Sequence, residues 1–330
     1  MKAMVWTKYG PPDVLQLREV EKPVPEEDEV LIRIHATTVT AGDCEMRRLK
    51  IPFLLRLPMR LYVGVGRPRR MTILGQELAG EIEGVGRKVR RFKEGDRVFA
   101  ATGFGLGAYA EYICLPEDGV MTMMPADLTW EEAAAVPVAG LEALYFLRKG
   151  NIQKGEQILI IGAGGSIGTA AVQLARYYGA VVTGVDLGEK LEALRSIGAD
   201  HVVDYTRKED AGGGRTYDVI FDVPGKSPFT RSLRMLRPNG RYLLGNSGML
   251  RKVRGAWVSG IGSRKVLFGT AEQKTEDLVF LKKLIEAGEW KPVIDRIYPL
   301  KEMVEAHRYV ESGKKMGNVA ISILHSDKIK

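Results

Sequence analysis

Four glycines and one aspartate are spaced for phosphate binding. The glycines are Gly162, Gly164, Gly165 and Gly168, and Asp186 follows the first of them by 24 residues. Glycine allows a tight turn at 162, close approach of the backbone to a phosphate at 165 and close helix packing at 168. A helix beginning at this turn directs free N–H groups and a partial positive charge towards an anion. The pattern predicts a site for the pyrophosphate of a dinucleotide, with Asp186 near a ribose hydroxyl.

The segments around these residues have the order that such a site needs. An apolar run at 158–161 is typical of a buried strand, alanines and leucine at 170–175 recur at helical spacing, and 180–185 reads as a second strand ending at Asp186. The glycine spacing is G-x-x-G-x-x-G and not the commoner G-x-G-x-x-G, so a strand–helix–strand unit without ligand is the alternative. Because strand, helix and acid are in the right order, we expect the site, including Ser166 and Ile167 in the turn.

Length and composition indicate a globular protein of two domains. The chain has 330 residues, 45% hydrophobic and 27% charged, with a net charge of +8. The first ten residues lack the apolar core of a signal peptide, and no run of 18 uncharged apolar residues occurs, so a cytoplasmic location is expected. Cys44 and Cys114 are the only cysteines, which excludes a disulfide framework and a cysteine-rich zinc lobe.

Periodicity changes twice along the chain. Residues 1–125 read as short strands between Gly and Pro turns, at 14–20, 30–35, 77–85, 96–101 and 109–115, which predicts an antiparallel barrel-like domain. In 30–35, Val30, Ile32 and Ile34 should face the core and Leu31 the other side. Residues 126–289 alternate strands and helices, which predicts a doubly wound parallel sheet and an α/β protein. A helix should begin after Asp127 or Thr129, and 290–330 should complete the first domain, with a frayed tail at 325–330.

Ligands of a doubly wound sheet bind at the carboxyl ends of its strands. Strands predicted at 217–222 and 241–245 place four further residues beside the glycine turn, namely Val223, Gly245, Asn246 and Ser247. A helix is expected between Asp186 and the next strand, over 189–197. The sequence thus predicts a cofactor site assembled from several strand ends.

Residues 47–70 carry eight basic residues and no acid, interleaved with apolar residues that include Leu57, Leu61 and Tyr62. We favour a basic loop or short helix whose apolar side covers the barrel, because the apolar residues show no sustained helical period. The alternative is a lip that contacts an anionic or lipophilic substrate, or a membrane surface.

With both domains placed, the chain resembles the medium-chain dehydrogenase/reductases, in the zinc-free, quinone-oxidoreductase-like branch. The resemblance is nearly full length. Its carriers are IHATTVTAGD at 34–43, ILGQELAGEIEGVG at 73–86, KEGDRV at 93–98, GAYAEY at 107–112, AAAVPVAGLEA at 133–143, the glycine turn, GADHVVDY at 198–205, YDVIFD at 217–222 and PNGRY at 238–242. The resemblance implies a GroES-like barrel built from both ends of the chain, a Rossmann domain in the middle, a cleft between them, and dimers that join Rossmann sheets.

The resemblance also decides the expected chemistry. Zinc-dependent relatives have metal ligands where this chain has Thr40, Gln76 and, approximately, Pro137, and none of these is a good zinc ligand. Alcohol oxidation without a Lewis acid is disfavoured, so the prediction is an NAD(P)H-dependent reductase of quinones or α,β-unsaturated carbonyls without metal. Thr40 is the candidate donor to the developing enolate, or else it bonds backbone or a nicotinamide ribose. Tyr62, Tyr145 or water supplies the proton.

Cofactor choice depends on the adenosine side. Asp186 should repel a 2′-phosphate, whereas Lys190 matches a phosphate-binding lysine of some relatives and Tyr205 lies at the family's adenosine-side position. We expect NAD(H) to be favoured over NADP(H). Asp186 could instead cap the following helix. The family has Thr where this chain has Glu142, which could act in proton transfer, favour oxidised nicotinamide or face solvent.

Two alternative functions stay open at this point. One is alcohol dehydrogenase activity without zinc. The other is a non-catalytic cofactor- and RNA-binding role, which only the net charge of +8 supports.

Overall fold

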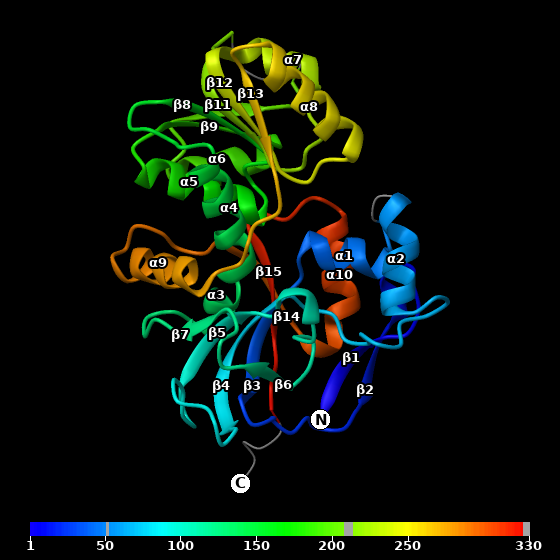
Figure 1. The fold of residues 1–330 in the computed structure, drawn as a ribbon. Coiled ribbons are helices and arrows are strands. Elements are labelled where there is room, and N and C mark those ends of the chain that lie inside the picture. The colour runs from blue at the N-terminus through cyan, green and yellow to red at the C-terminus, as the bar shows by residue number, and fades with distance from the viewer. Residues whose placement is uncertain (51–52, 208–213, 326–330) are drawn as a thin grey trace. The chain divides into compact units, whose positions relative to one another are not determined.

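The computed structural model describes residues 1–50, 53–207 and 214–325, which form two compact units (Figure 1). The first unit contains residues 1–138, 273–286 and 291–330, and the second contains residues 139–272 and 287–290. The chain therefore leaves the first unit twice, over residues 139–272 and 287–290, and returns to it each time.

The first unit is built on one large sheet, in the order β14-β15-β3-β4-β5-β7, with β6 also paired to β3. All pairs in it are antiparallel except β14 with β15, and β1 with β2 forms a separate antiparallel pair. The C-terminal strand β15 lies against β3, with Ala320 opposite Thr38. The strands are β1 (Lys2–Trp6), β2 (Leu15–Glu19), β3 (Glu29–Thr38), β4 (Glu77–Val85), β5 (Arg97–Ala101), β6 (Tyr112–Pro116), β7 (Met121–Met123), β14 (Ile294–Pro299) and β15 (Asn318–Ser322).

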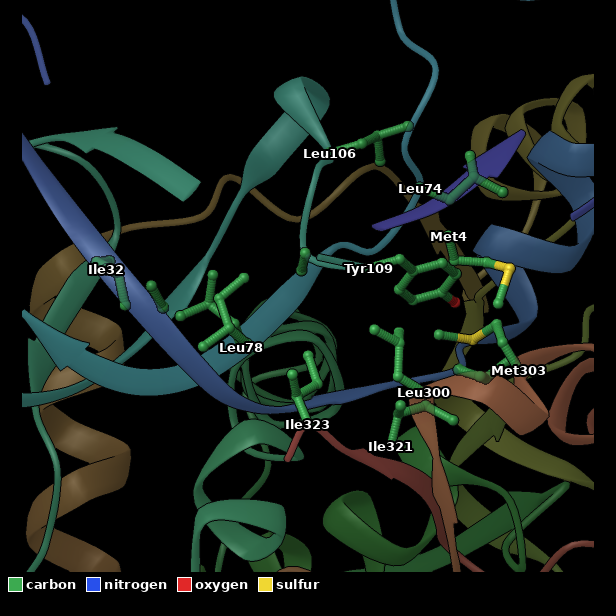
Figure 2. Packing of buried hydrophobic residues seen from close by; sticks show 14 of the residues in the cluster. Met4, Ile32, Leu74, Leu78, Leu106, Tyr109, Leu300, Met303, Ile321 and Ile323 are labelled. Atoms are coloured by element: carbon green, nitrogen blue, oxygen red, sulfur yellow. The ribbon is translucent and has the colours of Figure 1, made fainter. Parts of the chain in front are cut away.

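The core of this unit joins residues from both ends of the chain (Figure 2). Ile32 of β3, Leu78 of β4 and Ile321 of β15 are completely buried, and Met303 of α10 belongs to the same cluster. The expected alternation along β3 holds for its inward residues, but Leu31 is only 8% exposed, so the second face of β3 is also covered at this residue.

The first unit also contains five helices over the described residues. They are α1 (Ala41–Arg48), α2 (Phe53–Val63), α3 (Trp130–Ala134), α9 (Thr275–Glu286) and α10 (Met303–Glu311), with short 3-10 turns η1 (Pro12–Val14), η2 (Gly103–Gly105) and η4 (Leu300–Glu302). Thr129 caps α3 through a capping box with Glu132, so Thr129 and not Asp127 begins this helix.

The basic segment contains a helix whose apolar side does not simply cover the barrel. Leu57 and Leu61 of α2 are 66% and 68% exposed, whereas Val63 is buried. The expectation of a covering apolar side is therefore wrong for these two leucines.

The second unit is a parallel six-stranded sheet in the order β10-β9-β8-β11-β12-β13. This confirms the predicted doubly wound sheet. Its strands are β8 (Gln157–Ile161), β9 (Val181–Asp186), β10 (His201–Asp204), β11 (Tyr217–Asp222), β12 (Leu236–Leu244) and β13 (Lys265–Phe268). Its helices are α4 (Pro137–Lys149), which begins in the first unit, α5 (Ser166–Tyr177), η3 (Gly188–Lys190), α6 (Leu191–Ser196), α7 (Phe229–Met235) and α8 (Met249–Ile261).

In the second unit, two elements differ clearly from the sequence pattern. The helix predicted over 189–197 is divided into η3 and α6, and β12 begins at Leu236, five residues before the predicted strand. Among the described residues, no helix is both long enough and apolar enough to cross a membrane.

Candidate functional site

The glycine turn connects β8 to α5 and has backbone geometry that needs glycine. Gly162 has φ +77°, a conformation that side chains disfavour. A Cβ on Gly168 would lie 2.2 Å from the carbonyl oxygen of Gly162, so a side chain there would push the helix away from the turn. A Cβ on Gly165 would meet only the Gly162 oxygen, at 3.5 Å. Gly165 is therefore not required by packing within the chain, and an added methyl group would occupy the space beside the helix start.

Asp186 is bound to the turn by hydrogen bonds. Its Oδ2 accepts a 2.8 Å hydrogen bond from the Gly164 N–H, and its Oδ1 accepts one of 2.9 Å from the Leu187 N–H. Lys190 Nζ lies 3.2 Å from Asp186 Oδ1, and both side chains are almost completely buried. A Cβ on Gly164 would lie 2.6 Å from the Lys190 side chain. The ion pair thus packs directly beneath the turn, and Asp186 does not cap the next helix, whose N-cap is Leu187.

The other predicted residues lie at the same edge of the sheet, because parallel strands end together. The Val223 N–H donates to Ile161, and the Asn246 N–H donates to Val223 at 3.0 Å, so the ends of β8, β11 and β12 are joined. Within the described part of the chain, the buried Ser247 Oγ has no hydrogen-bond partner. Tyr205, just beyond the end of β10, is 56% exposed.

These features fit a dinucleotide. Gly165 begins α5 and has no side chain to cap it, which leaves an anion site at the helix start. The space that a Gly165 Cβ would fill is open to a ligand, and the buried, unpartnered Ser247 Oγ lies along the same edge of the sheet. Ser166 and Ile167 are the first residues of α5 and would present their N–H groups to a pyrophosphate.

A cluster of polar side chains in the first unit contains Thr40. Thr40 is the N-cap of α1 and forms a capping box with Asp43: its Oγ1 donates to Asp43 Oδ2 at 2.6 Å and accepts from the Asp43 N–H at 3.0 Å. Gln76 Nε2 donates to Thr40 Oγ1 at 2.9 Å. The Gly75 N–H donates to Asp43 Oδ1. Burial raises the pKa of Asp43, and the hydrogen bonds from Thr40 and Gly75 oppose this shift.

Glu77, the first residue of β4, is buried beside this cluster. Thr38 Oγ1 donates to one oxygen of its carboxyl group, and the Val138 N–H donates to the other at 2.7 Å. Burial raises the pKa of Glu77 to about 8, with the Thr38 hydrogen bond acting in the opposite direction. Glu77 thereby joins β3, β4 and the start of α4, and it is a proton-holding group that the sequence pattern did not reveal.

The three positions that hold zinc ligands in metal-dependent relatives do not fit the ion here. Thr40 and Gln76 are hydrogen-bonded to each other, and Pro137 has no donor atom in its side chain. Zinc prefers thiolate, imidazole or carboxylate ligands. Across residues 1–50, 53–207 and 214–325, no three or more His, Cys, Asp or Glu side chains are grouped so that they could hold a metal ion.

The two tyrosines proposed as proton donors lie in different units. Tyr62 on α2 is 47% exposed, and its ring lies 4.6 Å from the Arg70 guanidinium. The Tyr145 hydroxyl on α4 accepts a 2.8 Å hydrogen bond from Lys149 Nζ. Glu142, also on α4, is partly buried, and burial raises its pKa.

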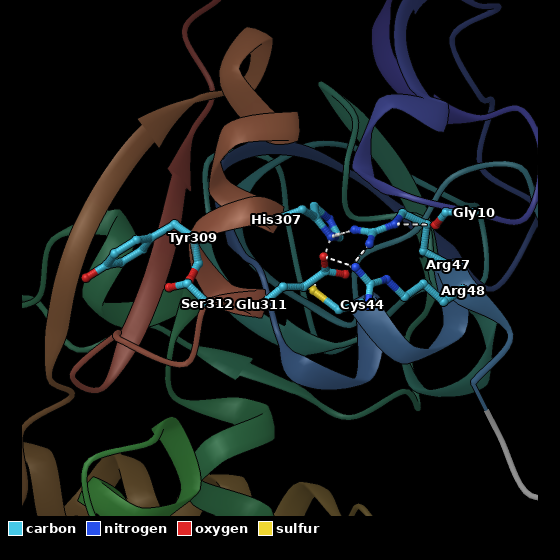
Figure 3. A network of polar contacts seen from close by, with 8 residues as sticks. All are labelled: Gly10, Cys44, Arg47, Arg48, His307, Tyr309, Glu311 and Ser312. Carbon is cyan, nitrogen blue, oxygen red and sulfur yellow. Dashed lines mark hydrogen bonds and ion pairs between the residues drawn. The ribbon is translucent and has the colours of Figure 1, made fainter. Parts of the chain in front are cut away.

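A second buried polar network joins α1 to α10 (Figure 3). Arg47 is completely buried; it donates to His307 Nδ1 at 2.6 Å and to the carbonyl of Gly10, and it forms an ion pair with Glu311. Cys44 Sγ lies 3.3 Å from the same His307 nitrogen. Burial raises the pKa of Cys44 to about 12 and, together with Arg47, lowers that of His307. The thiol is therefore protonated and the imidazole neutral, so the network links helices and does not activate a nucleophile.

Comparison with known proteins agrees with this geometry. Residues 26–125 match the family model of the alcohol dehydrogenase GroES-like domain, and residues 197–321 match that described as zinc-binding dehydrogenase. The chain is 32% identical to 2-methylene-furan-3-one reductase of Solanum lycopersicum, over 97% of this chain and 79% of the relative. It is also 32% identical to a quinone oxidoreductase of Pseudomonas aeruginosa, over 97% of this chain and 99% of the relative.

A solved structure is similar over the whole chain. The quinone oxidoreductase of Escherichia coli complexed with NADPH superposes with a TM-score of 0.82 and 28% identity, over 98% of this chain and 100% of that one. The fold, the glycine turn at the carboxyl edge of the parallel sheet and the similarity over the full chain support the same assignment. The chain belongs to the medium-chain dehydrogenase/reductase superfamily of oxidoreductases, in its zinc-free, quinone-oxidoreductase-like branch.

Proposed function

We propose that this protein is a zinc-independent, NAD(P)H-dependent reductase of quinones or α,β-unsaturated carbonyls. The observation that carries the proposal is the direct hydrogen bond between Gln76 and Thr40, at the two positions where metal-dependent relatives hold their ion. The glycine turn needed for cofactor binding is retained in the same chain. The relatives named quinone oxidoreductase and 2-methylene-furan-3-one reductase support the same substrate classes.

The bound nicotinamide would supply hydride to the β-carbon of an enone or to a quinone, and negative charge then develops on the substrate oxygen. Thr40 and Gln76 are the two candidates for stabilising that oxygen. The Thr40 hydroxyl proton is directed at Asp43, whereas the Gln76 amide group has two N–H bonds and uses one of them for Thr40. Gln76 therefore donates to the substrate, and Thr40 holds it in place. Tyr62, Tyr145 or water supplies the proton.

The test is oxidation of NADH or NADPH by a panel of quinones and enones in the presence of a chelator. Gln76→Leu should lower kcat by roughly 10²-fold, because one donor to a developing oxyanion is lost. Thr40→Ser, which keeps the hydroxyl, should retain activity, whereas Thr40→Val should not. Tyr62→Phe, Tyr145→Phe and Glu142→Gln assign the proton donor. An unchanged rate for Gln76→Leu would refute the role of the pair, and a requirement for added zinc would refute the proposal.

NADH is the proposed preferred cofactor. Asp186 is fixed by the glycine turn at the end of β9, and its partner Lys190 is already engaged in a buried ion pair. A 2′-phosphate near this site would have to separate Lys190 from Asp186 or meet the carboxylate. Asp186→Ser should shift the ratio of NADPH to NADH affinity by at least about tenfold towards NADPH. Fluorescence titration of both cofactors measures this ratio, and an unchanged ratio would show that Asp186 does not select the cofactor.

The proposal also includes a homodimer and a cytoplasmic location. Its functional domains are a cofactor-binding domain over residues 126–289 and a catalytic domain over residues 1–125 and 290–330. β13 is an edge strand of the parallel sheet, which makes it available for joining two sheets. Light scattering after gel filtration measures the mass of the particle, and a monomer at all concentrations would contradict the dimer.

A further inference from the structure

Helix α4 carries a tyrosine and a lysine that are hydrogen-bonded to each other. The two residues, Tyr145 and Lys149, are one turn apart, and the lysine Nζ donates to the tyrosine hydroxyl at 2.8 Å. Tyr145 is partly buried, whereas Lys149 is exposed to solvent. A phenol is thereby held against a cation, at a place where water also reaches the cation.

The residue next to Tyr145 fixes the rotation of α4 on the parallel sheet. Phe146 is 3% exposed, and its ring packs on the Phe221 ring of β11 with 5.0 Å between the centroids. The Tyr145 ring meets the Phe146 ring edge-on, with centroids 5.1 Å apart. Because Phe146 is anchored in the core, the direction of the adjacent tyrosine along the helix surface is set as well.

A glycine that follows β13 lies against the tyrosine hydroxyl. A Cβ on Gly269 would be 2.0 Å from the Tyr145 hydroxyl oxygen and 3.0 Å from Lys149 Nζ. Any side chain at this position would therefore displace the ends of both residues. The hydroxyl and ammonium groups occupy space that Gly269 leaves open.

This contact brings the hydroxyl to the edge of the sheet where the cofactor site was predicted. Leu244 lies opposite Phe268 in the parallel register of β12 and β13. The residues that come next, Gly245 and Gly269, therefore leave the two strands side by side. Gly245 is one of the predicted cofactor residues, and ligands of a doubly wound sheet bind along this edge. Tyr145 consequently places an O–H group at the cofactor edge.

The proposed reaction needs a proton as well as a hydride. Among the other groups considered for this role, Tyr62 has the Arg70 guanidinium against its ring, and the pKa of Glu142 is raised by burial alone. Tyr145 differs from both because an ammonium group lies at hydrogen-bond distance from its oxygen. An opposite charge at this distance stabilises the anion that proton donation leaves behind.

We propose that Tyr145 donates the proton in the reductase reaction and that Lys149 is its positioning residue; this inference rests on the proposed function. The phenol O–H bond breaks while the substrate oxygen, which holds the electron pair gained with the hydride, forms a new O–H bond. A quinone becomes a hydroquinone, and an enone becomes an enol that rearranges to the saturated carbonyl. The phenolate then takes a proton from the Lys149 ammonium group, and the exposed amine recovers one from water.

The experiment compares the wild type with Tyr145→Phe, Lys149→Met, Lys149→Arg and Gly269→Ala. Tyr177→Phe is the matched control, because Tyr177 is the last residue of α5, at the opposite end of that helix from the glycine turn. Rates are measured across pH with a naphthoquinone and an open-chain enone, and NADH affinity is measured by fluorescence titration. Ultraviolet difference spectra of the cofactor-free protein record tyrosine ionisation without turnover.

Tyr145→Phe and Gly269→Ala should lower kcat by about 10²-fold at unchanged NADH affinity, because a positioned proton donor is lost or displaced. Lys149→Met should lower kcat by about tenfold, because the phenolate loses its cation. Lys149→Arg should restore most of the rate, and Tyr177→Phe should keep all of it. The wild-type rate should fall at high pH, where the phenol loses its proton, and Lys149→Met should move this fall and the matching spectral ionisation to higher pH.

An unchanged rate and pH profile in Tyr145→Phe, with an active wild type, would overturn the inference and leave the proposed reductase activity intact. A loss of rate in Glu142→Gln or Tyr62→Phe, with Tyr145→Phe unaffected, would also overturn it. Equal losses of rate and NADH affinity in Tyr145→Phe would show a structural role and contradict proton donation. A wild type that binds NADH but reduces neither substrate class would instead refute the proposed function, and the inference with it.

Discussion

The glycine turn of the second unit and the Thr40–Asp43 cluster of the first hold polar groups by opposite means. The turn works by the absence of side chains: Gly162 and Gly168 bring backbone atoms within distances that a Cβ would violate. The cluster works by side chains from separate segments, with Asp43 receiving hydrogen bonds from Thr40 and Gly75, and Gln76 bonded to Thr40. Adding a side-chain atom should therefore disrupt the turn, whereas removing a polar side-chain atom should disrupt the cluster.

This difference extends to their titratable groups. Asp186 beneath the turn is paired with the cation of Lys190, at 3.2 Å. Asp43 and Glu77 in the first unit are buried among neutral donors, and burial raises the pKa of both. The carboxylate beneath the turn is therefore paired with a cation, whereas burial shifts the pKa of both carboxyl groups in the first unit upward. Substitutions that add an atom to the turn or remove one from the cluster distinguish these two kinds of site.

The largest expected effect is on stability in the side-chain cluster. Asp43→Ala removes an N-terminal capping group and leaves buried donors of Thr40 and Gly75 without an acceptor, so unfolding should become easier by about 2–4 kcal/mol. Denaturant unfolding measures this. Asp127→Ala, at an exposed acid near α3, is the control and should change stability by less than about 0.5 kcal/mol. A similar small change for Asp43→Ala would show that the cluster is not structural.

Adding one methyl group to the turn should have different effects at Gly168 and at Gly165. Gly168→Ala places Cβ 2.2 Å from a carbonyl oxygen and should lower both stability and NADH affinity, by about 1–3 kcal/mol. Gly165→Ala meets nothing closer than 3.5 Å, so it should leave the melting temperature unchanged and lower NADH affinity alone. Calorimetry and fluorescence titration give the two quantities. An unchanged NADH affinity of Gly165→Ala would show that the pyrophosphate does not bind at this turn.

The smallest expected effect is a pH dependence from Glu77. The native state keeps its proton up to the pKa of about 8, whereas the unfolded chain releases it near 4.5. The native state therefore binds more protons in this window, and stability falls as the pH rises through it. Glu77→Gln, which resembles the protonated form, should flatten the decline between about pH 5 and about pH 8 in thermal unfolding. Parallel curves for variant and wild type would assign the decline to other groups.

The exposed apolar residues of α8 could not be predicted from the sequence; they are Met249, Leu250, Val253 and Trp257. The sequence pattern yielded no helix or strand at 249–268, and the apolar residues there could equally have filled a core. Gly255 against Val266 decides that the small side of the helix faces inward and the large residues face outward. Similarly, no sequence signal connects Cys44 with His307, which is 263 positions away and 3.3 Å distant.

The sequence by itself determined the glycine turn, the strand and helix on either side of it, the terminal Asp186 and a helix that begins near Asp127 or Thr129. Each depends on residues within a few positions or on one strand–helix–strand unit, where spacing fixes geometry. Only the tertiary structure decided that Gln76 donates a hydrogen bond to Thr40, that the buried Glu77 accepts one from Val138, and that Lys190 forms an ion pair with Asp186. These contacts depend on the pairing of distant strands and on burial, which shift pKa values and choose partners after the local elements have formed.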